Sequence, residues 1–172
     1  MADTQLIQKM VSRIGKVDSY RLKAGTLEES DFDRMAKIFG EIKELPITVI
    51  SKVRTIQDIE VKTRQLKNRE ELDVLFIDYL QLVKSSGRFG SREQEVAEIS
   101  RTLKLLSLEL EIPVVALCQL NRNATRNEPT LADLRESGAI EQDADNLIFL
   151  YQEEGQEEKK TPTVIAKVAK QR

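Results

Sequence analysis

Short, wholly apolar runs alternate with amphipathic segments along most of this chain, and this alternation limits the possible folds more than any other feature. The three runs are Val74–Ile77, Val114–Cys118 and Leu147–Leu150. A strand that is apolar on both faces is typical of the centre of a parallel sheet with helices on each side. Alternation of strands with helices favours the same architecture. The pattern predicts an α/β domain with a mainly parallel sheet flanked by helices.

Helical spacing dominates before the first run. One helix is expected near the N-terminus, with Asp3 or Thr4 as its cap, and a second is expected to follow Ser30. Asp33 stands three residues after Ser30, as in a capping box. The expected buried face of this second helix consists of Phe32, Met35, Phe39 and Ile42.

Pro46 should end the second helix, and the apolar segment Ile47–Ile50 then predicts a short strand. Residues 1–45 are therefore expected to be the helical part of a single domain that covers residues 1–172, and residues 46–172 its sheet core. The length of 172 residues suits one domain with a sizeable core.

Helices are also expected between the runs. Ile56, Ile59 and Leu66 mark the first of them. A glycine-containing loop, Ser85–Ser91, precedes a longer helix, whose expected buried face consists of Val96, Ile99, Leu103, Leu106 and Leu110. The last apolar segment, Val164–Val168, is interrupted by a lysine and follows a stretch rich in Glu and Lys, as in a C-terminal edge hairpin.

Composition excludes several kinds of chemistry. The chain has no histidine, which removes Ser-His-Asp and Cys-His catalysis and zinc sites that contain histidine. A formal net charge of −2 gives no bulk attraction to nucleic acid, so any such binding must depend on a few local groups. No apolar run is long enough for a membrane span. The single cysteine, Cys118, cannot form an internal disulfide, and a reducing, cytoplasmic setting is expected.

Two polar residues directly follow apolar runs, where a parallel sheet gathers its ligands. Asp78 follows the apolar run that ends at Ile77. The Walker B acid, which holds Mg²⁺ beside nucleotide phosphates, stands in the same position after a strand. By itself this pattern is common in α/β proteins without any metal. Gln119 follows Cys118 and could contact a γ-phosphate or position water, or it could simply cap the strand.

A charged segment, Leu134–Asp145, precedes the third apolar run and contains one glycine, Gly138. This glycine permits a tight turn or a close approach of the backbone to a phosphate. A solvated loop with one helical turn is the simpler alternative for a segment of this composition.

Together these motifs resemble those of the DnaB-type replicative helicases. The resemblance is carried by Asp78–Leu82, Gln119–Arg122, Leu131–Asp145 and the ending Ile165–Arg172, in the same order as in the family, and the early stretch Arg13–Gly25 is similar too. It implies part of a RecA-like P-loop NTPase core, from a ring of six identical subunits that uses ATP and Mg²⁺ to move on single-stranded DNA and unwind duplex at the replication fork. A primase and a helicase loader are the further partners that it implies.

The resemblance also implies roles for particular residues. Asp78 would help to hold Mg²⁺, and Gln119 would sense the γ-phosphate and relay its state toward DNA. Lys170 and Arg172 resemble the finger residues that reach the nucleotide of the next subunit, although a basic C-terminus without function is the simpler alternative. The residues expected to face DNA are Arg135, Glu136 and Gly138, with the loop Ser85–Ser91 and its Arg88 as a weaker second candidate.

No G-x-x-x-x-G-K-[ST] motif occurs in the chain. In the family this phosphate-binding loop lies upstream of the region that the present sequence resembles, as does the glutamate that activates the attacking water. The isolated chain is therefore expected to hydrolyse no ATP. Two other hypotheses remain open: a non-catalytic assembly module, and a different RecA-like ATPase such as a recombinase.

Overall fold

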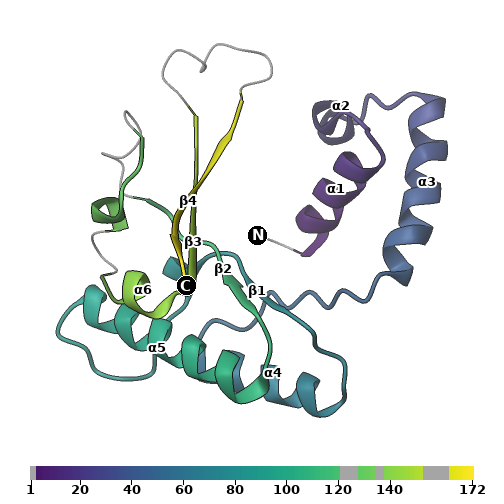
Figure 1. Cartoon of the computed structure of the whole chain (residues 1–172). Helices are drawn as coiled ribbons and strands as arrows, with labels where there is room; N and C mark the ends of the chain where they lie inside the picture. Colours follow the sequence, from purple (N-terminus) through teal and green to yellow (C-terminus); the bar gives the residue numbers. More distant parts are fainter. Residues whose placement is uncertain (1–2, 121–127, 135–137, 153–162) are drawn as a thin grey trace. The chain divides into compact units, whose positions relative to one another are not determined.

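The computed structural model describes residues 3–120, 128–134, 138–152 and 163–172, and the chain divides into two compact units. The first unit spans Met1–Val53 and the second spans Arg54–Arg172. Helices α1 to α3 belong to the first unit, and all the strands in Figure 1 belong to the second. Each unit is described by itself.

The first unit consists of α1 (Asp3–Ile14), α2 (Ser19–Ala24) and α3 (Glu29–Glu44). The two longer helices pack closely where α1 ends. A Cβ at the buried residue Gly15 would lie 2.8 Å from the Val11 carbonyl oxygen and 3.3 Å from Cγ1 of Ile38. Glycine at position 15 therefore avoids a clash with the last turn of α1 and leaves room for Ile38 of α3.

Helix α3 begins earlier than the sequence predicts, and its buried face consists partly of other residues. Its N-cap is Glu28, and the acid of the first turn that bonds back to the cap is Asp31 rather than Asp33. Phe32 and Phe39 are exposed at 58% and 45%. The inward side carries Met35 and Ile42, as predicted, but Asp31 and Ile38 replace Phe32 and Phe39, one residue earlier in each case.

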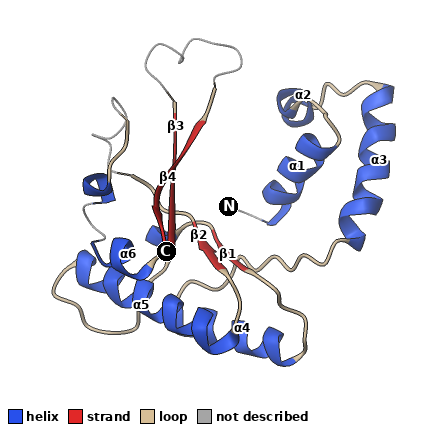
Figure 2. Cartoon of the chain, in the orientation of Figure 1, coloured by secondary structure: helices blue, strands red, loops and turns tan. Residues whose placement is uncertain are grey.

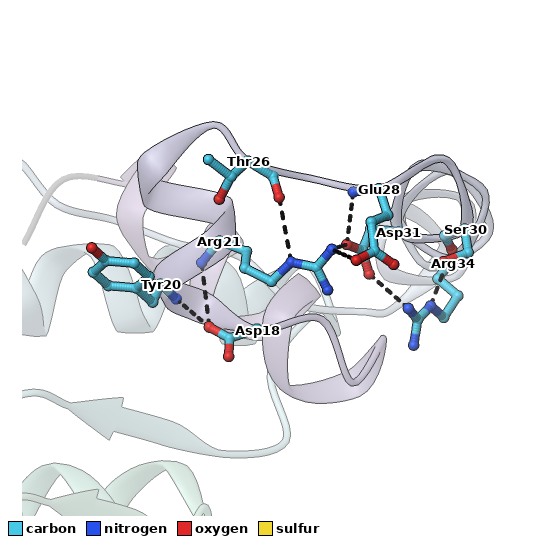
Figure 3. Close-up of polar contacts among 8 residues, drawn as sticks. All are labelled: Asp18, Tyr20, Arg21, Thr26, Glu28, Ser30, Asp31 and Arg34. Atoms are coloured by element: carbon cyan, nitrogen blue, oxygen red, sulfur yellow. Dashed lines mark hydrogen bonds and ion pairs between the residues drawn. The ribbon is translucent and has the colours of Figure 1, made fainter.

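Asp31 determines this orientation, because its buried carboxylate is surrounded by donors (Figure 3). Its side chain is 1% exposed and lies 2.6 Å from Nη2 of Arg34 and 3.2 Å from Nη2 of Arg21. The Glu28 N–H donates to the same carboxylate at 3.0 Å. Glu28 and Ser30 each precede an acid by three residues, so spacing alone does not distinguish the two caps; the two arginines select the first.

Replacing Asp31 by alanine should lower the free energy of unfolding of the first unit by about 2–3 kcal/mol. Hydrogen bonds to charged groups contribute roughly 1.5–3 kcal/mol each, and partial exposure lets both arginines return to water, which limits the loss. Urea denaturation followed by circular dichroism measures the change. Asp33→Ala on the exposed side of the same helix is the matched control, and equal stability of the two variants would contradict the prediction.

The strand predicted at Ile47–Ile50 is absent: these residues are irregular and exposed. A strand requires a hydrogen-bonded neighbour, and none of the described residues forms a ladder with this segment. An apolar run after a proline is therefore not sufficient to predict a strand.

The second unit contains α4 (Ile56–Asn68), β1 (Leu75–Ile77), η1 (Leu80–Leu82), α5 (Arg92–Leu110) and β2 (Val114–Ala116). The chain continues through η3 (Leu131–Leu134), α6 (Gly138–Asp143), β3 (Asn146–Tyr151) and β4 (Ile165–Gln171). Figure 2 shows β1 and β2 as a short pair and β3 and β4 as a longer pair. The helices predicted around Ile56 and after the loop Ser85–Ser91 are confirmed, with Val96, Ile99, Leu103 and Leu106 buried in α5.

Strands β1 and β2 are parallel, with Phe76 opposite Val115. Their inner face packs with Ile56 of α4 and Ile99 and Leu103 of α5 in one apolar cluster. The outer face is open, because Phe76 is 69% exposed and Val115 is 42% exposed. Among the described residues of the second unit, α4 and α5 cover the same side of this strand pair, so the helices predicted on the other face are not found within this unit.

Strands β3 and β4 pair antiparallel, which confirms the C-terminal hairpin but makes the third apolar run antiparallel to its neighbour. Leu147 pairs with Lys170, whereas Ile148 pairs with Val168, so Ala169 is an extra residue on β4. A bulge of this kind turns the following side chain toward the other face of the strand. Lys170 consequently lies on the inner side together with Ala169.

Candidate functional site

The carboxyl ends of β1 and β2 meet, as the parallel pairing requires. The Leu117 N–H donates to the Ile77 carbonyl oxygen at 2.9 Å, and the Leu80 N–H donates to the Leu117 carbonyl oxygen at 2.9 Å. Asp78 lies between Ile77 and Leu80, and Gln119 follows Leu117 by two residues. The structure therefore brings together the two candidates that the sequence placed at strand ends.

The Asp78 side chain is suited to an external ligand. It is exposed, and none of the described residues forms a hydrogen bond or ion pair with its carboxylate. The described residues include no group of three or more acidic, histidine or cysteine side chains that could enclose a metal ion. Mg²⁺ commonly takes one or two carboxylates and completes its shell with water and phosphate oxygens. The single exposed carboxylate of Asp78 is compatible with this kind of magnesium coordination.

Gln119 is held by its main chain rather than by its side chain. The Gln119 N–H donates to Oε1 of Gln81 at 3.2 Å, and its carbonyl oxygen accepts from Nε2 of Gln81 at 3.0 Å. The Gln119 side chain is left exposed at the sheet edge. Sequence reasoning quoted Gln81 as part of a motif and gave it no role, because its partner stands 38 residues away.

The segment after Gly138 is anchored on α5 by its acids. Asp143 accepts from the Ser100 hydroxyl at 2.8 Å, and Asp145 accepts from the Lys104 ammonium at 2.6 Å. The hydrogen bond from Lys104 lowers the pKa of Asp145 below its ordinary value. These last two acids of the charged segment therefore attach the end of α6 and the start of β3 to α5. Their role in this structure is to hold the fold together.

Gly138 begins α6, and its backbone is not in the left-handed region. A Cβ at this position would meet nothing within 4 Å, so the fold itself does not require glycine there. The tight turn considered for Gly138 is therefore not the reason for this residue, and open space for a close approach to the backbone remains. Arg135 and Glu136, the other two predicted DNA contacts, lie outside the described residues.

The two candidate DNA segments border a common groove of about 380 Å³ between α5 and α6. Phe89, from the loop Ser85–Ser91, lies at this groove together with Ala139, the neighbour of Gly138. Arg101 and Glu98 of α5 add charge to its wall. The structure thus places the weaker candidate loop beside the start of α6.

Lys170 and Arg172 differ in their surroundings. The Lys170 ammonium donates to the carbonyl oxygens of Glu141 at 2.5 Å and Gln142 at 3.4 Å, at the end of α6. Arg172 is exposed, and its N–H donates to the Asp145 carbonyl oxygen at 3.0 Å. Its guanidinium forms no hydrogen bond or ion pair with the described residues, although its charge helps to lower the pKa of Asp145. Lys170 therefore secures α6 within its own chain, whereas Arg172 is available to a neighbour.

Comparison with known proteins assigns this arrangement to a family. The family described as "DnaB-like helicase C terminal domain" matches residues 1–172. The chain belongs to this DnaB-like helicase family. Replicative DNA helicase DnaB of Mycobacterium leprae (strain TN) is 41% identical over 155 residues, which are 88% of this chain and 26% of that protein. DnaB of Geobacillus stearothermophilus is 40% identical over 160 residues, which are 90% of this chain and 35% of that protein.

Two solved structures match this chain over its full length. The ATPase domain of G40P has a TM-score of 0.90 and 32% identity; the match covers 100% of this chain and 64% of that one. A DnaB-like replicative helicase, described with its interactions with primase, gives the same TM-score and identity and is covered to 43%. The DnaB-like chain thus spans about a quarter to a third of the curated relatives. No helix among its described residues is long and apolar enough to cross a membrane.

Proposed function

We propose that this chain is part of the ATP-driven motor of a replicative DNA helicase, which moves along single-stranded DNA and unwinds duplex at the fork. The observation that carries the proposal is the meeting of Asp78 and Gln119 at one sheet edge, in a chain that matches the DnaB-like domain along its whole length. Both side chains are exposed at this edge.

At this edge the chain contributes two groups to nucleotide chemistry. Asp78 would bind a magnesium ion, which supplies positive charge beside the phosphates of ATP when it is bound. Gln119 would donate to the γ-phosphate from its side-chain amide, because its main chain is already engaged by Gln81. A charge and a donor fixed in advance stabilise the charge that develops in phosphoryl transfer.

DNA would be bound at the start of α6. Gly138 offers an open approach to the backbone, and Arg135 and Glu136 stand three and two residues before it in the sequence. Contacts of backbone N–H groups and one arginine with phosphates give affinity without reading base sequence. A motor that moves along any sequence needs binding of this kind.

Subunits would join in a ring of six, with Arg172 directed at the nucleotide of the next subunit. Its free guanidinium supports that role, and the engaged ammonium of Lys170 supports a structural role in placing β4 against α6. Primase and a helicase loader would be further partners of the complete protein.

The test compares the complete protein with the 172-residue chain. The complete protein should hydrolyse ATP with Mg²⁺, faster with single-stranded DNA, and should unwind a forked duplex. The isolated chain should show no turnover above the blank, since it has no G-x-x-x-x-G-K-[ST] loop to enclose the phosphates. Strand exchange without unwinding would identify a recombinase instead, and DNA binding without hydrolysis by the complete protein would identify an assembly module.

A further inference from the structure

The Gln81 side chain makes the main-chain hydrogen bonds with Gln119 that a neighbouring strand would otherwise make. The β1–β2 ladder ends at Ala116, so the main chain of Gln119 has no ladder partner. Gln81 donates to its carbonyl oxygen at 3.0 Å and accepts from its N–H at 3.2 Å. Both ends of one side-chain amide are thus used on one residue, and the donor-acceptor pattern fixes the orientation of that amide.

The main chain around Gln81 is held in turn by the first turn of α5. Nη2 of Arg92 donates to the carbonyl oxygens of Gln81 at 3.0 Å and Val83 at 3.1 Å. Glu95 pairs with Arg92 and accepts from the Ser85 N–H at 2.9 Å. The Ser85 N–H and the Arg92 guanidinium lower the pKa of Glu95 below its ordinary value, so the carboxylate is charged at neutral pH. A continuous chain of polar contacts therefore runs from Gln119 to the beginning of α5.

We propose that Gln81 is the positioning residue that sets Gln119 relative to Asp78 and couples Gln119 to the first turn of α5. This inference rests on the proposed function, in which Asp78 and Gln119 face the nucleotide. A displacement of Gln119 by the γ-phosphate would pull on Gln81 and, through Arg92, on α5 and the preceding loop Ser85–Ser91. That loop reaches the groove beside the start of α6, where DNA is proposed to bind.

The first arm of the test concerns the contact itself, in the 172-residue chain. Gln81→Met keeps the volume of the side chain and removes its two hydrogen bonds with Gln119, together with the one that it donates to Sγ of Cys118. Amide hydrogen exchange at Gln119, followed by NMR, should become roughly 5–30-fold faster, the change expected when one or two kcal/mol are lost. Gln81→Glu retains the acceptor and should keep most of the protection. Gln65→Met, at an exposed position of α4, is the matched control, and unchanged exchange in Gln81→Met would overturn the inference.

The second arm concerns coupling, in the complete protein. Gln81→Met should lower kcat for ATP with little change in KM, and should reduce the ratio of DNA-stimulated to basal turnover by roughly 5–30-fold, whereas Gln65→Met should change neither. A merely structural role would lower basal and stimulated turnover equally, so an unchanged ratio would overturn the inference. An inactive wild-type protein would instead contradict the proposed function, and the exchange experiment would still decide whether Gln81 positions Gln119.

Discussion

In rings of the complete protein, Arg172→Ala should lower ATP turnover by roughly 10³-fold or more, the range found for arginine fingers supplied by a neighbour. Within its own chain the guanidinium acts on the described residues only through its charge near the exposed Asp145, without a hydrogen bond or ion pair, so its removal should leave the fold intact. A cation that arrives from outside the pocket stabilises the transition state only when the subunit interface is closed. The steady-state rate with saturating ATP and Mg²⁺ measures the loss.

Mixed rings test whether Arg172 acts on the next subunit. Rings formed from equal amounts of Arg172→Ala and Asp78→Asn subunits should regain turnover, although each variant alone is inactive. About a quarter of the interfaces would then join an intact pocket to an intact finger, because each interface is asymmetric. Lys170→Ala should not be rescued in this way, since the Lys170 ammonium bonds to α6 of its own chain. Absence of any regained turnover would exclude the trans role.

The elements with a continuous apolar face are predictable from the sequence. Helix α5 buries Val96, Ile99, Leu103 and Leu106 as their spacing indicates, because local periodicity and tertiary packing agree there. Asp78 and Gln119 are found together because parallel strands bring their carboxyl ends to one edge. These placements follow from local pattern and general topology alone.

Other features depend on contacts between distant residues, which local pattern does not contain. The start of α3 depends on Arg21. Its ion pair with Asp31 favours the acid three residues after Glu28 over the acid three residues after Ser30. Lys170 faces inward because of one extra residue on β4, whereas Arg172 lies beyond the end of that strand. The open face of β1 and β2 carries apolar side chains, which in the sequence look the same as those of a covered face.

Asp78→Asn should lower ATP turnover by the complete protein roughly 10³-fold or more. A metal ion contributes several kcal/mol of charge stabilisation in the transition state, and each 1.36 kcal/mol corresponds to about tenfold in rate. Asparagine keeps the shape and removes the negative charge that attracts Mg²⁺. Because the Asp78 carboxylate has no partner among the described residues, the variant should fold and assemble normally.

Asp73→Asn, exposed two residues before β1, removes the same charge at the opposite end of the strand and is the matched control. It should hydrolyse ATP as the wild type does. Turnover measured against Mg²⁺ concentration, together with sedimentation of the rings, separates loss of the metal from loss of assembly. If Asp78→Asn rings assembled and turned over ATP at the rate of Asp73→Asn rings, Asp78 would not hold the metal. The edge formed by β1 and β2 would then lack the charge on which nucleotide chemistry there depends.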